Sequence, residues 1–213
     1  MKIQPSLLLA AALALALPVV AQAANEPAAP DMVPAKVADT RAALRDLWIG
    51  HVFWVRNVVD ASFEGDAAAA KSAEQQVVAN AKAIAGSIEP FYGKPASDAL
   101  FGLLAGHWGA IKERLNATRT GDKAGEDAAM KALLKNADEI AAFLSGANPN
   151  LPRDTLYGLL TAHGGHHVQQ IDQFKAKQLD AEAKTWAAMT QHMYVIADAL
   201  ANGIAKQFPD KFR

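Results

Sequence analysis

Three histidines, His51, His107 and His163, recur at a fixed interval of 56 residues, and imidazole is the side chain that most often binds metal ions in proteins. Each has leucine or tryptophan three and four positions before it, so it lies on the apolar stripe of a helix and is expected to face inward. Several neutral imidazoles at one level of a helical bundle provide the nitrogen ligands that suit zinc and copper. The spacing therefore indicates a buried histidine site with metal binding as its possible chemistry.

Two further histidines extend this set. His167 lies four residues after His163, a spacing that places both rings on one helix face and lets them chelate one ion. His192 follows in the next expected helix, whereas His166 is one residue off the face and is expected at its rim. The predicted metal ligands are thus His51, His107, His163, His167 and His192, with the site expected near the third repeat, which alone has the additional histidines.

The histidines belong to a longer internal repeat. The string LFGLLAGH, which ends at His107, recurs 56 residues later as LYGLLTAH, and Gly65-Asp66 recurs at the same offset as Gly121-Asp122. Self-similarity at such a period is typical of repeated supersecondary units that bury their apolar faces against one another. Apolar residues recur at three and four positions and strong strand patterns are absent, so each unit is predicted to be a helical hairpin.

Turn and capping residues set the expected boundaries of the helices. Asp39 or Thr40 and Asp66 can cap the first two helices, whereas Pro90 and Pro95 interrupt the chain between the first and second hairpins. The fold class predicted is all-α, an antiparallel bundle of six helices built from three tandem hairpins. The later helices are expected from Ser97 or Asp98 to about Leu115, from the Gly121-Asp122 turn to Leu144, from about Asp154 to Lys177, and from about Asp180 to Lys206.

Asparagines accompany the histidines at matching heights. Asn80 lies as far after the Gly65-Asp66 turn as His51 lies before it, and Asn136 stands in the same relation to His107. At about 1.5 Å rise per residue, antiparallel helices would bring these residues, with His163 and His192, to one polar layer. Asn80 and Asn136 are therefore predicted to support the site. The alternative is that three separate pairs, His51 with Asn80, His107 with Asn136 and His163 with His192, only fix helix register.

The sequence offers less support for functions other than metal binding. Two histidines facing each other across a bundle can ligate a haem, which is a further alternative to copper or zinc. We find no Glu-x-x-His pair, no His-Glu-x-x-His, no nucleophile elbow and no glycine-rich phosphate loop. No catalytic residue is therefore assigned, and the sequence favours a binding protein, for a metal or another small ligand, or a structural or partner-binding protein over an enzyme.

The first residues predict export. Lys2, the apolar run from Leu7 through Val20 and the small residues up to Ala23 are typical of a signal peptide at 1–23. Residues 24–37 are expected to be a flexible leader, and residues 38–213 the helical domain, in the periplasm or secreted. Charges are nearly balanced, with 21 basic and 22 acidic residues, which offers no global attraction to nucleic acid. No later stretch is long and apolar enough to predict a membrane span, the chain has no cysteine, and a protein partner stays unspecified.

The segments LWIGHVFWVRNVV, NADEIAAFLSGANPN and KQFPDKF are similar to a family of small secreted bacterial helical proteins. Some members are labelled glycosyltransferases or acetylglutamate kinases without the motifs of either activity. The resemblance spans most of the mature chain and includes His51, Asn136 and His192 with the methionine after it. It implies a shared helical fold and a shared polar layer, but no activity. His166 and His167 are not part of the family's pattern.

Overall fold

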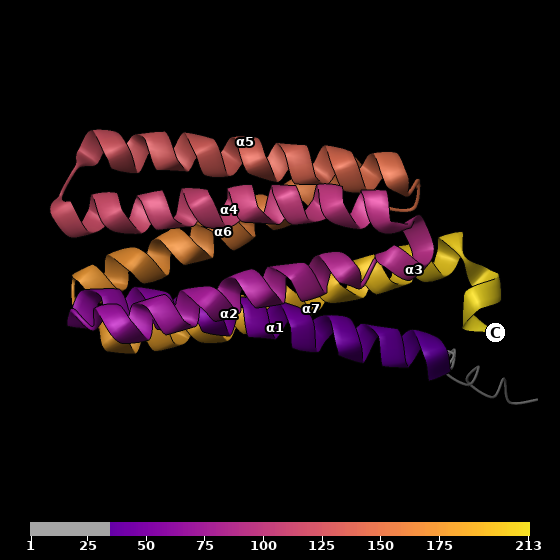
Figure 1. The fold of residues 1–213 in the computed structure, drawn as a ribbon, viewed down its shortest axis with the longest axis horizontal. Helices are drawn as coiled ribbons and strands as arrows, with labels where there is room; N and C mark the ends of the chain where they lie inside the picture. Colours follow the sequence, from indigo (N-terminus) through magenta and orange to yellow (C-terminus); the bar gives the residue numbers. More distant parts are fainter. Residues whose placement is uncertain (1–34) are drawn as a thin grey trace, which may run out of the picture. The chain divides into compact units, whose positions relative to one another are not determined.

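The computed structural model describes residues 35–213, so the predicted signal peptide at 1–23 and the leader up to residue 34 lie outside the described residues. Residues 35–213 form helices and no strand, as the sequence predicts, and consecutive long helices pack as antiparallel hairpins (Figure 1). The elements are α1 (Ala35–Glu64), α2 (Ala67–Gly86), α3 (Glu89–Tyr92), α4 (Lys94–Thr120), α5 (Lys123–Ala147), α6 (Arg153–Lys175), α7 (Leu179–Gln207) and the 3₁₀ helix η1 (Pro209–Phe212).

The first two hairpins turn in the same way. Gly65 and Gly121 adopt left-handed φ angles of 80° and 76°, which glycine reaches without steric cost. Asp66 then accepts a hydrogen bond from the Ala69 amide, and Asp122 from the Gly125 amide, so each aspartate caps the returning helix. These caps confirm the predicted turns and fix where each hairpin begins its second helix.

Two helices begin earlier than the sequence pattern suggests. Helix α1 begins at Ala35, inside the expected leader, and its Val37 is buried against Ile204 and Phe212 near the carboxyl end of the chain. Helix α4 begins at Lys94 with Pro95 in its first turn. Proline is tolerated there because the first amides of a helix have no partner within it. Contact with distant residues therefore extends α1 at its amino end. The tolerance of proline in a first turn lets α4 begin before the residue that the sequence pattern predicts.

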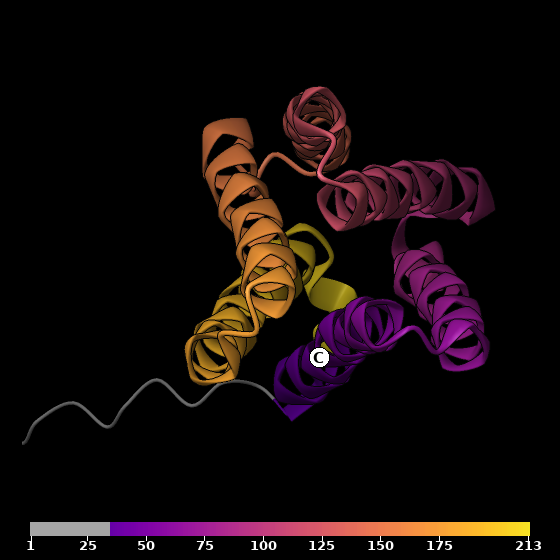
Figure 2. The same ribbon diagram turned by 90° about the vertical axis from the view of Figure 1, so that its left-hand side faces the viewer.

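The six long helices follow one another in chain order around a ring, which α7 closes by packing against α1 (Figure 2). Helix α6 also contacts α1 and α4, the first helices of the other two hairpins. Helices α1, α4 and α6 therefore provide the inner surface of the ring, and these are the helices that contain His51, His107 and His163. No helix within residues 35–213 combines the length and apolar character needed to cross a membrane.

The apolar core lies on both sides of the repeated histidines. Trp48, Leu104 and Leu160, one turn before the histidines, belong to one buried cluster. Val55 and Ile111, one turn after them, belong to a second cluster. The histidines thus occupy a polar level between two apolar regions of the bundle, where every buried nitrogen needs a partner.

A buried carboxylate on α7 connects α1, α6 and α7. Glu182 accepts hydrogen bonds from Arg56 Nε at 2.7 Å and Nη2 at 2.6 Å, and from Gln170 Nε2 at 2.9 Å. The Glu182 side chain is 2% exposed and that of Arg56 is 33% exposed. The Arg56–Glu182 pair joins α1 to α7, the first and last long helices, where the ring closes.

Replacing Arg56 with methionine is expected to lower the free energy of unfolding by about 3 kcal/mol, because it leaves a buried carboxylate without its charge partner. Urea unfolding followed by circular dichroism measures this loss. Arg153→Met is the matched control, since Arg153 and Asp138 form a pair that is 54% and 50% exposed and such pairs contribute under about 1 kcal/mol. Equal losses in both variants would contradict the role of the Arg56–Glu182 pair.

Candidate metal centre

The three repeated histidines converge between the inner helices. His51, His107 and His163 are buried, with 5%, 5% and 1% of their surface exposed. Their ring centroids lie 6.0 Å apart for His51 and His107, 5.5 Å for His51 and His163, and 5.3 Å for His107 and His163. The inward orientation predicted from the leucines before them is therefore confirmed, and the three rings meet at one level.

His167 adds a fourth ring one helical turn after His163. It is 2% exposed, and its ring centroid lies 4.5 Å from that of His163. At the corresponding positions of the other two hairpins the chain has Val55 and Ile111, both fully buried in the core. A single exchange of an apolar core residue for histidine thus turns a layer of three imidazoles into a group of four.

The four rings have the spacing of a tetrahedral metal site. One ring nitrogen from each of the four histidines can be chosen so that all lie within 4.8 Å of one another. The six centroid distances range from 4.5 to 6.1 Å. With metal–nitrogen bonds of about 2.0–2.1 Å, the centroids of four tetrahedral imidazoles lie roughly 5 Å apart. A small contraction of the cluster would therefore let it hold one ion.

The ring nitrogens of this cluster are without partners. Six buried nitrogens have no hydrogen bond within the part of the chain that the structure describes: Nε2 of His51, both nitrogens of His107, both of His163, and Nε2 of His167. An unpaired buried polar atom costs about 1–3 kcal/mol. Hydrogen bonding within the described residues therefore does not account for the cluster. A metal ion would bind one nitrogen of each ring, four of the six, and would leave one nitrogen each of His107 and His163 without a partner.

Burial keeps these imidazoles neutral. It lowers the pKa of His51 to about 3, with a further contribution from His107. It lowers the pKa of His107 to about 4, against a smaller opposing effect of the Asn136 amide. The pKa values of His163 and His167 fall well below the ordinary value for the same reason, with the neighbouring histidines adding to the effect. Neutral imidazole is the form that binds metal, so the cluster needs no deprotonation at pH 7.

The expected pairs between histidines and asparagines do not form as hydrogen bonds. The Asn136 amide lies close enough to His107 to oppose the lowering of its pKa, but neither ring nitrogen of His107 has a hydrogen-bond partner in the described residues. Asn80 and Asn136 each donate from Nδ2 to a backbone carbonyl, of Leu47 and Leu103, at 3.0 Å. His192 makes the same contact in the third hairpin, with Nε2 2.8 Å from the Leu159 carbonyl oxygen. His192, predicted as a ligand, is therefore outside the cluster of four. Asn80 and Asn136 support the histidines indirectly, by donating to backbone carbonyls of α1 and α4.

Two glycines leave room for the asparagine side chains to contact the backbone of α1 and α4. A Cβ atom on Gly50 would lie 3.0 Å from Asn80 Nδ2, and one on Gly106 would lie 3.3 Å from Asn136 Nδ2. These two glycines, each directly before a repeated histidine, let the amide side chain pack against the helix. The recurring Gly-His dipeptide is the sequence signal for this contact, whereas the matching heights alone predict contacts between the asparagines and the histidines.

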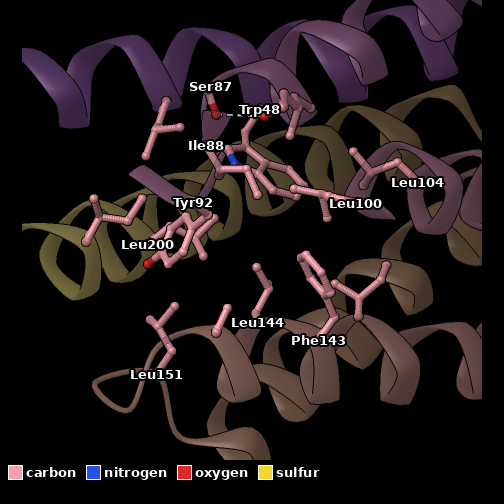
Figure 3. A pocket seen from close by; sticks show the side chains of 15 residues that line it. Trp48, Ser87, Ile88, Tyr92, Leu100, Leu104, Phe143, Leu144, Leu151 and Leu200 are labelled. Carbon is pink, nitrogen blue, oxygen red and sulfur yellow. Dashed lines mark hydrogen bonds between the residues drawn. The ribbon is translucent and has the colours of Figure 1, made fainter. Parts of the chain in front are cut away.

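A small cavity lies beside the site. Trp48 packs edge-on against His51 and His163, with centroids 6.1 and 6.3 Å apart, and also lines an apolar cavity with leucines and Phe143 (Figure 3). Its volume of about 30 Å³ is far below the roughly 300–1,000 Å³ of a typical small-molecule site. The four rings themselves lie too close together to leave a slot for a haem. The geometry thus favours a single ion over either larger ligand.

No protein-family model, curated protein or solved structure matches this chain. The resemblance to small secreted helical proteins therefore stays a prediction.

Proposed function

We propose that this protein is an exported metal-binding protein that holds one zinc or copper ion between His51, His107, His163 and His167. The observation that supports the proposal most directly is that these four buried histidines each bring one ring nitrogen within 4.8 Å of the others. Export rests on the signal-peptide pattern at 1–23.

Four protein ligands favour holding an ion over catalysis. Catalytic zinc sites typically use three protein ligands and leave one position for water or substrate, whereas structural sites are closed by four. Here all four histidines are at most 5% exposed. We therefore propose storage, transport or structural stabilisation as the use of the metal.

The arrangement of the ligands favours Zn²⁺ or Cu⁺ over Cu²⁺. The six centroid distances, from 4.5 to 6.1 Å, are closer to the equal spacing of a tetrahedron than to the sides and diagonals of the planar arrangement that Cu²⁺ prefers. The four ligands are neutral, and no carboxylate from residues 35–213 belongs to the cluster. Burying the single charge of Cu⁺ therefore costs less than burying the two charges of Zn²⁺.

The alternative, a polar layer that only fixes helix register, explains less. Asn80, Asn136 and His192 already make equivalent backbone contacts in the three hairpins. The four clustered histidines are not needed for that purpose, and without a ligand their unpaired nitrogens would destabilise the fold.

Titration of the metal-free protein with Zn²⁺, and separately with Cu⁺ under reducing conditions, tests the proposal. We expect one tightly bound ion per chain by elemental analysis after gel filtration, and none in His107→Leu. Gln191→Ala, an exposed change on α7, serves as the control and should bind one ion. Circular dichroism establishes that each variant is folded. A folded wild-type protein that retains neither ion would overturn the proposed function.

A further inference from the structure

A second pair of histidines lies at the surface next to the buried cluster. His166 on α6 and His192 on α7 are both half-buried, and their ring centroids are 5.6 Å apart with planes inclined by 61°. An ion bound by two imidazole nitrogens at about 2.0–2.1 Å would place the two centroids roughly 5–6 Å apart. The pair therefore has the spacing of a two-ligand metal site.

His192 is oriented as a metal ligand usually is. The Leu159 carbonyl oxygen only accepts hydrogen bonds, so Nε2 of His192, 2.8 Å away, is the nitrogen that bears the hydrogen. Nδ1 then has the free lone pair. Metal-binding histidines are typically held in this way, with one ring N–H donated to a carbonyl or carboxylate so that the other nitrogen binds the ion.

Both histidines are confined to the third hairpin. At the offset of 56 residues, His166 corresponds to Trp54 and Ala110, and His192 corresponds to Asn80 and Asn136. The asparagines already make the backbone contact, so histidine at 192 keeps that contact and adds a metal-binding nitrogen. Two independent positions of one hairpin thus become histidine, and the packing of α6 on α7 brings them together.

The pair lies adjacent to the buried cluster. His166 directly precedes His167 in α6. His192 contacts the carbonyl of Leu159, which lies one turn before His163 in α6. The four clustered histidines are almost fully buried, whereas His166 and His192 are half-buried, so an ion from solvent reaches this pair more readily than the cluster.

We propose that His166 and His192 form a second, labile metal site through which the ion enters the buried four-histidine centre. The proposal rests on the proposed function of that centre. Transfer is an exchange of one neutral imidazole for another, with no change in oxidation state. His167, the immediate neighbour of His166, would be the first ligand of the centre to bind the arriving ion.

Stopped-flow transfer of Zn²⁺ from a fluorescent chelator measures entry. We expect His166→Gln, and the double variant Ala162→Gly with His192→Asn, to slow uptake at least about tenfold while still binding one ion at equilibrium. The double variant reproduces the glycine and asparagine of the first two hairpins, so it keeps the backbone contact. Ala162→Gly alone is its control and should load at the wild-type rate. Unchanged uptake rates in His166→Gln and the double variant would overturn the entry route and leave the proposed function standing.

Binding at the pair itself is tested separately in His107→Leu, in which the buried centre is disabled. We expect one weakly bound Zn²⁺, detected as a shift of the His166 and His192 imidazole ¹⁵N resonances and lost when His166→Gln is added. Absence of this weak site would overturn the pair as a metal site. If the wild-type protein shows only the weak site and no tight one, the proposed function fails and the entry route fails with it.

Discussion

Replacing His167 with valine is expected to abolish tight metal binding and to raise the stability of the metal-free protein by about 1–3 kcal/mol. Valine is the residue at the corresponding position of the first hairpin, where Val55 is fully buried. The change removes one of four ligands and one buried polar side chain whose Nε2 has no partner in the described chain. Its effects on the metal-free and metal-loaded proteins therefore have opposite signs.

Urea unfolding with and without metal measures both effects. An ion present at about a thousand times its dissociation constant adds about 4 kcal/mol to the free energy of unfolding. We expect this gain in the wild-type protein and its absence in His167→Val, with affinity lower by more than the 10–100-fold that changes around a ligand typically cost. The expected result is a variant that is more stable without metal and less stable with it.

His167→Asn separates the two causes. Asparagine removes the imidazole but keeps a polar side chain, so this variant should lose metal binding without gaining stability in the metal-free state. If His167→Val were destabilised to the same extent with and without metal, His167 would be an ordinary core residue and not a ligand.

The metal-free protein is expected to unfold steeply on acidification between about pH 6 and 4. Burial lowers the pKa of His51 to about 3 and that of His107 to about 4, and lowers those of His163 and His167 in the same direction. In the unfolded chain the histidine pKa is about 6.5. Below that pH the unfolded chain binds protons that the native cluster does not, so stability falls as pH falls towards the native pKa values.

The size of the effect follows from the number of histidines. Each pH unit is worth about 1.4 kcal/mol for a ring that stays neutral in the native state. Going from pH 6.5 to 5 therefore costs about 2 kcal/mol each for His51 and His107. His163 and His167 act in the same direction, so the combined loss is a large part of the roughly 5–15 kcal/mol that stabilises a domain of this kind. Acid unfolding should therefore be cooperative in proton uptake.

Circular dichroism against pH, with potentiometric measurement of proton uptake, checks this expectation. His167→Val should unfold at lower pH and take up one proton fewer. The metal-loaded wild-type protein should also unfold at lower pH, because its rings must release the ion before they bind protons. A metal-free protein that stays folded at pH 4, with the same profile in His167→Val, would contradict the burial of neutral imidazoles.

The all-helical fold could be read from local chemistry. The hairpin turns follow from Gly65 and Gly121 with their capping aspartates, because positive φ and side-chain capping are properties of one or two residues. The inward orientation of His51, His107 and His163 follows from helical periodicity. The early start of α1 at Ala35 was not predictable in this way, because Val37 is buried by residues near the far end of the chain.

The sequence by itself determined which histidines share a height and which of them face the core, since rise per residue and periodicity set both. It did not determine which rings meet. That depends on how each helix is rotated about its axis and which helices line the interior of the ring, and packing of all six helices decides both. The tertiary structure therefore decides that His167 joins the buried cluster. It also decides that His192 contacts the Leu159 carbonyl and lies beside His166 at the surface.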